Sequence, residues 1–220
     1  MRWGALFDWD GVIIDSSRQH ELSWEQLARE ESLKLPPDHF HQGFGRKNTW
    51  IIPNILGWAS EPAEIARLGE RKEWLYREIL KAEGIQPLPG VKALLEGLRE
   101  AGVPRAVGSS TPRVNIETIL DLLGLDGIFD AIVAAEDVSQ GKPDPEVFLK
   151  GAAAIQREPT CCIVFEDMPV GLQAAKAGGM KAVAVTTSKP RDALTAADRI
   201  VDSFEALTLD ELEGLVASTA

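Results

Sequence analysis

The sequence predicts an α/β protein: a doubly wound parallel sheet with helices on both faces and an inserted all-helical domain. Apolar runs of strand length alternate with helical patterns over most of the chain. The segment 16–86 breaks this alternation, because it contains helical patterns and turns only. The 220 residues fit one large domain with a modest insertion. We therefore expect a core of residues 1–15 and 87–220 and a helical domain of residues 16–86.

Five apolar segments have the length of buried strands, at 3–9, 103–108, 131–135, 161–165 and 181–185. Helical patterns at 90–101 and 112–123 each stop at a glycine, Gly102 or Gly124, a residue that ends helices readily. Another helix begins at Asp144 and Pro145, and the acidic stretch 207–216 is typical of an amphipathic surface helix. These elements give the repeated strand–helix order of a parallel sheet.

The helical insertion holds four of the six tryptophans, which are Trp24, Trp50, Trp58 and Trp74. It shows no run of alternating or β-branched residues that would predict a strand. A helical block of this size after the first strand is expected to pack a small core of its own. Its borders are predicted at Asp15/Ser16 and within 86–89.

Charge and composition exclude several classes of protein. The chain has 23 Lys and Arg against 34 Asp and Glu, a net charge of −11 that repels nucleic acid. No apolar run approaches the roughly 20 residues of a membrane span, and the stretch 3–7 meets Asp8 before it could form a signal-peptide core. The only cysteines, Cys161 and Cys162, are adjacent and are expected as small core residues entering a strand. We expect a cytoplasmic protein.

The first predicted strand ends in two carboxylates, Asp8 and Asp10. Ligands bind at the carboxyl ends of strands in open α/β sheets. Paired carboxylates there suit a hard cation such as Mg²⁺, which prefers oxygen ligands. Acidic loops are common, so this pair alone is weak evidence.

The second predicted strand ends in Ser109, Ser110 and Thr111 and is followed by a helix. Hydroxyls and backbone N–H groups at a helix N-terminus can hold an anion such as phosphate. Simple capping of the helix by Ser110 or Thr111 is the alternative, and it is favoured when this motif is taken alone.

Two further groups complete the set. Lys142 lies between Gly141 and Pro143, and the fourth predicted strand ends in Glu166 and Asp167. Each pattern alone fits a turn or a solvated loop. All are expected at one edge of the sheet, where two acidic clusters, a hydroxyl and a lysine match magnesium-assisted phosphoryl transfer.

Four segments in order, FDWDGVIIDS, VGSSTP, GKPDPEVF and VFEDMPVGLQAAKAGG, resemble the motifs of the haloacid dehalogenase (HAD) superfamily. The chain is similar to the subgroup with a helical cap inserted after the first strand, which includes β-phosphoglucomutases and small sugar phosphatases. The resemblance covers nearly the whole chain. It implies a Rossmann-like core with a helical cap domain.

The resemblance also implies roles for the motif residues. Asp8 would be the nucleophile that forms an aspartyl-phosphate, and Asp10 the general acid and base. Ser109 and the backbone N–H of Ser110 would hold the phosphoryl group, and Lys142 would balance its charge. The implied cofactor is Mg²⁺, bound by Asp8, the backbone carbonyl of Asp10 and Asp167, with Glu166 as a ligand or as a partner behind the ligands.

Other reaction classes are less consistent with these residues. Asp10 disfavours a dehalogenase, which lacks an aspartate two residues after its nucleophile, and a phosphonate hydrolase, which has a small residue there. A phosphoacceptor receiver domain shares the magnesium site, hydroxyl and lysine, but it has no inserted helical domain and carries its paired acids and its phosphoacceptor on separate strands. A catalytically dead binding module is opposed by the intact motif set.

The cap is expected to decide the substrate. His20, Arg46 in the segment 43–46, and Lys72 resemble residues that in the mutases couple closure to acid–base readiness or bind substrate. Packing of His20 against its helix and a solvated face around Lys72 are the structural alternatives.

Two departures weaken the mutase interpretation, since Gln42 and Pro112 stand where mutases have lysines; Lys47 and Arg113 are the cations that could compensate. We therefore predict a monomeric, Mg²⁺-dependent phosphatase of a small phosphorylated metabolite, with a sugar phosphate as the expected class and a phosphomutase as the alternative.

Overall fold

The structure is a computed structural model that describes residues 3–43 and 46–217. It divides into two compact units, one of Met1–Asp15 with Gln86–Ala220 and one of Ser16–Ile85. The helical unit therefore ends at residue 85, one residue before its predicted end at residue 86. Among the described residues, no helix has the length and apolar character needed to cross a membrane.

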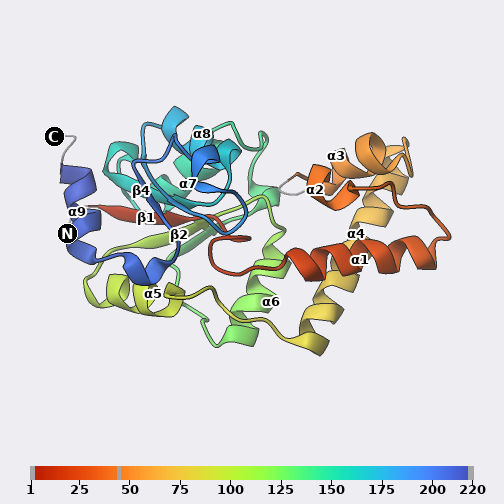
Figure 1. Ribbon diagram of the computed structural model, residues 1–220, viewed down its shortest axis with the longest axis horizontal. Helices are drawn as coiled ribbons and strands as arrows, with labels where there is room; N and C mark the ends of the chain where they lie inside the picture. Colours follow the sequence, from red (N-terminus) through yellow and green to blue (C-terminus); the bar gives the residue numbers. More distant parts are fainter. Residues whose placement is uncertain (1–2, 44–45, 218–220) are drawn as a thin grey trace. The chain divides into compact units, whose positions relative to one another are not determined.

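The larger unit is built on a six-stranded sheet in the order β3-β2-β1-β4-β5-β6, and all of its strand pairs are parallel (Figure 1). The chain runs outward from β1 through β2 to β3 and then returns to β4 on the other side of β1. The direction therefore reverses between β1 and β4, and open α/β sheets bind ligands at such a switch point. The strands are β1 Gly4–Phe7, β2 Arg105–Gly108, β3 Ala131–Val133, β4 Cys162–Glu166, β5 Lys181–Val185 and β6 Arg199–Val201.

Helices cover both faces of this sheet, with α7 and α8 on one face and α5 and α6 on the other (Figure 1). On the α7/α8 face, Leu6 and Val164 pack with Phe148 of α7 and Leu172 of α8. The helices are α5 Val91–Glu100, α6 Arg113–Leu123, α7 Glu146–Ala154, α8 Pro169–Ala177 and α9 Leu209–Ala217, with 3-10 turns at Ala135–Asp137, Pro159–Cys161, Arg191–Ala193 and Phe204–Ala206. The predicted α/β fold is confirmed.

The predicted elements differ from the observed ones mainly at their ends. Gly102 and Gly124 follow their helices with φ values of 67° and 64°, the left-handed conformation that glycine adopts readily. β6 was not predicted, because its three residues are too few to form a recognisable apolar run. Cys162 is buried in β4 as predicted, but Cys161 is only half-buried.

All regular elements among the described residues of the smaller unit are helices. Its core joins Trp24 and Leu27 of the first helix to Ile52, Leu68 and Leu75 from the later ones. The elements are α1 Ser17–Glu30, α2 His39–Gly43, α3 Asn48–Ile51, the π-helical turn Ile52–Leu56 and α4 Pro62–Glu83.

The tryptophans of this unit divide into two kinds. Trp24 is buried, and Trp58 packs edge-on against it with ring centroids 5.8 Å apart. Trp50 and Trp74 are 40% and 43% exposed, and the guanidinium groups of Arg46 and Arg71 stack on them. Only two of the four tryptophans therefore contribute to the core of this unit.

Candidate active site

Strand register brings the sequence motifs of the larger unit to one edge of the sheet. Phe7 pairs with Phe165 of β4 and with Val107 of β2. The backbone N–H of Asp8 continues this ladder, donating to the carbonyl of Phe165 at 3.0 Å. Asp8 therefore lies level with Glu166, at the switch point between β1 and β4.

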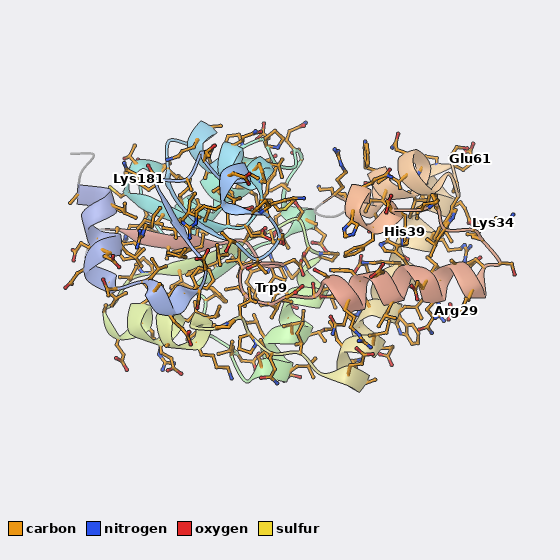
Figure 2. The ribbon with its side chains drawn as sticks, viewed as in Figure 1. Trp9, Arg29, Lys34, His39, Glu61 and Lys181 are labelled. Carbon is orange, nitrogen blue, oxygen red and sulfur yellow. The ribbon has the colours of Figure 1, made fainter. Side chains whose placement is uncertain are left out.

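The loop after Asp8 is anchored by Trp9, which is labelled in Figure 2. Its side chain is fully buried. The Trp9 carbonyl accepts hydrogen bonds from the backbone N–H groups of Val12 and Ile13. This tight turn directs the chain away from the sheet directly after Asp10. The strand consequently ends at Phe7 rather than at residue 9.

Lys142 is held between two carboxylates. Its Nζ lies 2.9 Å from Oδ1 of Asp8 and 2.7 Å from Oε1 of Glu166. The Lys142 side chain is 8% exposed and that of Glu166 is 1% exposed, so these interactions are shielded from water. The lysine is thereby fixed beside Asp8.

Both carboxylate oxygens of Glu166 accept hydrogen bonds from other groups of the protein. While Oε1 accepts from Lys142, Oε2 accepts from the backbone N–H groups of Asp167 and Met168, each at 2.8 Å. A Cβ atom on Gly171, in the first turn of α8, would lie 1.6 Å from Oε1. Glycine is required there so that the Glu166 carboxylate can approach the helix.

The carboxylate of Asp167 differs from that of Glu166 in its hydrogen bonding. It is completely buried, and neither of its carboxylate oxygens makes a well-formed hydrogen bond among the described residues, although the nearby Ser188 hydroxyl acts to lower its pKa. Gly11, with φ of +81°, lies so close that a Cβ atom there would be 1.9 Å from Oδ2 of Asp167. A buried carboxylate without partners is unfavourable unless a cation binds it.

The electrostatics of the cluster reflect an excess of negative charge. Burial raises the pKa of Asp8 to about 7, against the opposing effect of Lys142. Burial and the neighbouring Glu166 and Asp8 carboxylates raise the pKa of Asp167 well above its usual range. Burial alone would lower the pKa of Lys142, but the carboxylates of Asp8 and Glu166 raise it above its ordinary value.

These residues fit a divalent cation with oxygen ligands. Asp8, Glu166 and Asp167 offer carboxylate oxygens that all lie within 4.8 Å of one another. Lys142 is the cation seen beside them among the described residues, so three carboxylates face one ammonium group. Mg²⁺ would supply the missing positive charge. Because Glu166 is already fully hydrogen-bonded, Asp8 and Asp167 are the better ligand candidates.

The hydroxyl motif follows β2, the strand that pairs with β1, so it lies at the same edge of the sheet as this cluster. Ser109 directly follows β2, is 2% exposed, and donates its backbone N–H to the carbonyl of Val133. The cap of α6 is Pro112, without a side-chain capping bond, so the interpretation of Ser110 or Thr111 as a simple helix cap is wrong.

Thr111 is the residue that the sequence analysis missed. Its backbone N–H donates to Oγ of Ser109 at 3.1 Å, and its hydroxyl donates to Oδ2 of Asp10 at 2.5 Å. The only available signal was a third hydroxyl in the Ser109–Thr111 run, which capping explained equally well.

Arg113, one of the two cations that could compensate for the missing lysine at Pro112, binds groups of the larger unit. Its Nη2 donates to Oδ2 of Asp137 at 2.6 Å and to the carbonyl of Ile132 at 2.8 Å. The guanidinium group is therefore hydrogen-bonded to the end of β3 and to the turn that follows it.

In the smaller unit, His20 and Lys72 come together. Nδ1 of His20 lies 2.6 Å from Nζ of Lys72, and the His20 ring stacks on Tyr76 with centroids 4.0 Å apart. Lys72 is 2% exposed, and its Nζ donates to Glu73 at 2.9 Å. Asn48 donates to the same oxygen of Glu73 at 2.6 Å, so Lys72 belongs to a buried polar network rather than to a solvated face.

The loop expected to contact substrate is only partly described. Arg46 is exposed and its guanidinium carbon lies 4.0 Å from the centre of the Trp50 ring. Gln42 and Gly43 are in α2, whereas residues 44 and 45 lie outside the described residues.

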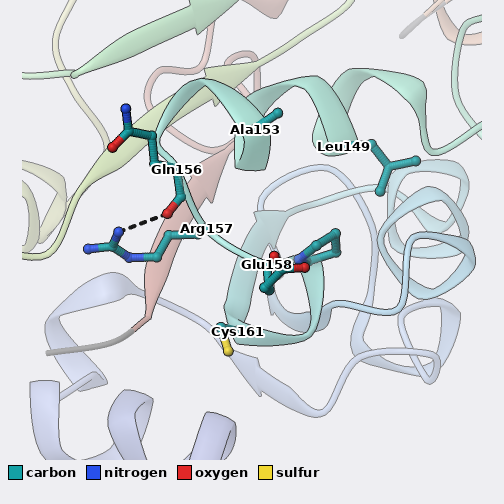
Figure 3. A pocket seen from close by; sticks show the side chains of 7 residues that line it. Leu149, Ala153, Gln156, Arg157, Glu158 and Cys161 are labelled. Carbon is teal, nitrogen blue, oxygen red and sulfur yellow. Dashed lines mark hydrogen bonds between the residues drawn. The ribbon is translucent and has the colours of Figure 1, made fainter.

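A hollow of about 780 Å³ lies at the opposite end of β4 (Figure 3). Leu149 and Ala153 of α7 line it together with Arg157, Glu158 and Cys161. Cys161 precedes the start of β4, whereas Glu166 ends that strand. The hollow is therefore separate from the carboxylate cluster.

The fold and site define an enzyme of the class that transfers or hydrolyses phosphoryl groups. The family model described as haloacid dehalogenase-like hydrolase matches residues 4–179. The chain belongs to the haloacid dehalogenase-like hydrolase family.

Relatives within the family include both phosphatases and a mutase. The chain is 37% identical over 217 residues to the chloroplastic 5-amino-6-(5-phospho-D-ribitylamino)uracil phosphatase of Arabidopsis thaliana, covering 96% of this chain but only 57% of that relative's length. It is 32% identical to hexitol phosphatase A of Escherichia coli, covering 94% and 93% of the two chains. It is also 32% identical to β-phosphoglucomutase of Bacillus subtilis, covering 94% and 92%.

Solved structures agree with this membership. The crystal structure of β-phosphoglucomutase from Clostridium difficile superposes with a TM-score of 0.86 at 26% identity, covering 100% of this chain and 99% of that one. Hexitol phosphatase A and the β-phosphoglucomutase of Bacillus subtilis have the same identity to this chain, so this level of similarity does not choose between the two reactions.

Proposed function

We propose that this enzyme is a Mg²⁺-dependent phosphatase that hydrolyses a small phosphorylated metabolite, with sugar phosphates as the expected substrate class. The observation that carries the proposal is the buried cluster of Asp8, Glu166 and Asp167 around Lys142. It combines a carboxylate nucleophile with a fixed lysine and an unsatisfied excess of negative charge.

The proposed metal ligands are Asp8, the backbone carbonyl of Asp10 and Asp167, with Glu166 holding Lys142 and the loop behind them. When bound, Mg²⁺ supplies positive charge that neutralises the phosphoryl oxygens and the carboxylates. The two buried oxygens of Asp167, which make no well-formed hydrogen bond among the described residues, support this assignment.

In the proposed first step, a carboxylate oxygen of Asp8 attacks phosphorus. The bond from phosphorus to the leaving oxygen breaks, and Asp10 gives that oxygen a proton. Ser109 and the backbone N–H of Ser110 hold the phosphoryl group, while Lys142 balances its charge. In the second step, Asp10 takes a proton from water, whose oxygen attacks phosphorus and releases phosphate from Asp8.

Hydrolysis is favoured over isomerisation by the way this chain uses its cations. A mutase that turns over a bisphosphate needs cationic groups for the second phosphate. Arg113 is bound to Asp137. Gln42 and Pro112 add no charge. These interactions support a monophosphate substrate.

The proposed substrate contacts in the cap are His20, Arg46 and Lys72, in line with the resemblance. Lys72 and His20 support this role through their shared buried network, in which the lysine is held at a fixed place. We further propose a monomer in the cytoplasm, which size-exclusion chromatography and cell fractionation would test.

The second candidate function is a phosphomutase, because a relative that is 32% identical carries that name. One assay separates the two: β-glucose 1-phosphate with Mg²⁺ and a trace of glucose 1,6-bisphosphate, followed for free phosphate and glucose 6-phosphate. We expect phosphate release without isomerisation. Glucose 6-phosphate formed faster than phosphate would establish the mutase instead. If neither forms, p-nitrophenyl phosphate tests hydrolysis independently of the sugar.

A further inference from the structure

Thr111 connects two of the groups proposed to carry the chemistry. Its hydroxyl donates to Oδ2 of Asp10, and its backbone N–H donates to Oγ of Ser109 at 3.1 Å. Thr111 is 7% exposed, so both hydrogen bonds are largely protected from water. We propose that Thr111 is a positioning residue that orients the Asp10 carboxylate for proton transfer. This inference rests on the proposed function, in which Asp10 is the general acid and base.

The backbone around Thr111 is itself anchored. Its carbonyl accepts a hydrogen bond from the backbone N–H of Ala135 at 3.1 Å, which ties it to the turn after β3. Pro112 follows with φ of −57°, and α6 begins at Arg113. The proline ring restricts φ, and the helix fixes the chain beyond it. The Thr111 hydroxyl is therefore presented from a held backbone.

The side chain of Thr111 is suited to orienting the Asp10 carboxylate. A threonine is β-branched and has fewer accessible χ1 rotamers than a serine, so its hydroxyl direction is better defined. A hydroxyl has one proton, and here that proton is directed to Asp10. The bond from Thr111 restrains the plane of the Asp10 carboxylate. Misplacement of a catalytic group by about 1 Å can lower a rate by about 100-fold.

Proton donation has a kinetic signature that mere loss of structure lacks. A phenolate leaving group needs a proton from the general acid, whereas p-nitrophenolate is a weak base that departs with little assistance. Loss of acid catalysis therefore lowers kcat/KM more for phenyl phosphate than for p-nitrophenyl phosphate. A general structural defect lowers both by the same factor.

The experiment measures kcat/KM for these two esters, with Mg²⁺, for the wild type, Thr111→Val and Thr111→Ser. We expect Thr111→Val to lose at least about tenfold on phenyl phosphate and less than about threefold on p-nitrophenyl phosphate. Thr111→Ser, which retains the donor, should restore most of the difference. Thr118→Val is the matched control, since the Thr118 hydroxyl donates to the carbonyl of Val114 within α6 in an exposed hydrogen bond.

The outcomes separate the inference from the function on which it rests. Equal losses on both esters, or no loss, would overturn the role of Thr111 while the phosphatase assignment stands. Failure of the wild type to hydrolyse either ester would overturn the proposed function and this inference with it. Thermal unfolding of each variant identifies a loss that comes from misfolding, and Thr111→Ser then decides the question.

Discussion

Oε1 of Glu166 lies 2.7 Å from Nζ of Lys142, while Oε2 accepts two backbone N–H groups. Every partner of this carboxylate is therefore a donor. Glu166 joins the lysine beside Asp8 to the start of α8, and it does so in a buried position where unsatisfied polar groups are costly.

Glu166→Gln should lower the free energy of unfolding by about 1–3 kcal/mol. A glutamine has only one acceptor oxygen, so its NH₂ group must face either Lys142 or the backbone donors. We also expect a loss of activity, because Lys142 loses the partner that fixes it. Denaturant unfolding and hydrolysis of p-nitrophenyl phosphate measure the two effects.

Two helical glycines give a matched check on Glu166. Gly171→Ala brings a Cβ atom to the Glu166 carboxylate and should reproduce the loss, whereas Gly97→Ala in α5 meets only a side-chain atom at 3.8 Å. Gly97→Ala should be neutral or stabilising by up to about 1 kcal/mol. Equal behaviour of the two variants would contradict the proposed placement of Glu166.

Asp167→Asn should have opposite effects on stability and activity. Removing the ionisable group of a buried carboxyl whose pKa is raised well above its usual range should raise the stability of the metal-free protein near neutral pH, because folding then no longer buries or neutralises that charge. The same change should abolish the increase in Tm that Mg²⁺ gives the wild type, together with most activity. Calorimetry with EDTA or with Mg²⁺ measures both. A variant that still gains stability from Mg²⁺ would show that Asp167 is not a ligand.

The network around Glu73 predicts a pH-dependent stability of the helical unit. Burial would raise the pKa of Glu73, but the charges of Lys72 and His20 outweigh it and lower the pKa to about 2. A lowered pKa means that the contribution is complete above the ordinary pKa of 4.5 and is lost as the pH falls toward 2.

The stability difference between the wild type and Glu73→Gln should therefore be constant above about pH 5 and shrink below pH 4.5. Its size near neutral pH should be on the order of 3 kcal/mol. Tryptophan fluorescence follows the unfolding, since Trp24 is buried in this unit. Glu78→Gln on the same helix, paired with Lys81 at the surface, should cost about 0.5 kcal/mol or less. A difference that grows as the pH falls would contradict the lowered pKa.

Arg113→Ala tests whether the substrate needs a cation at this position. Because the guanidinium group is bound to Asp137 and to the carbonyl of Ile132, we expect kcat/KM within about twofold of the wild type and a stability loss of about 1 kcal/mol or less. Inhibition by glucose 1,6-bisphosphate should also be unchanged. A marked weakening of that inhibition would assign Arg113 to a second phosphate and favour the mutase.

The fold was largely predictable because its signals are local. Strand-length apolar runs, and glycines such as Gly102 and Gly124 after helices, depend on nearby residues alone. β6 was missed because Arg199–Val201 is recognised only through its pairing with β5. The sequence did not distinguish the buried tryptophans of the insertion from the exposed ones, because the exposure of Trp50 and Trp74 depends on packing between helices.

The composition of the site was predictable, but the use of its groups was not. The order of the motifs identified Asp8 and Asp167 as candidates. Only the structure shows that Glu166 accepts hydrogen bonds on both oxygens, whereas Asp167 makes no well-formed hydrogen bond among the described residues. Thr111 could not be separated from a helix cap, since the hydrogen bond to Asp10 joins segments 101 positions apart. The pairing of Arg113 with Asp137 is likewise a contact that spacing does not reveal.

The central claim is that Asp8 carries the phosphoryl group during hydrolysis. The most direct measurement mixes the enzyme with Mg²⁺ and p-nitrophenyl phosphate, quenches with acid within the first turnover, and locates any phosphoryl group by peptide mass spectrometry. We predict phosphorylation of Asp8 in the wild type, its disappearance in Asp8→Asn, and its retention in the control Asp15→Asn. Turnover without a phosphorylated Asp8, or undiminished turnover by Asp8→Asn, would contradict the account.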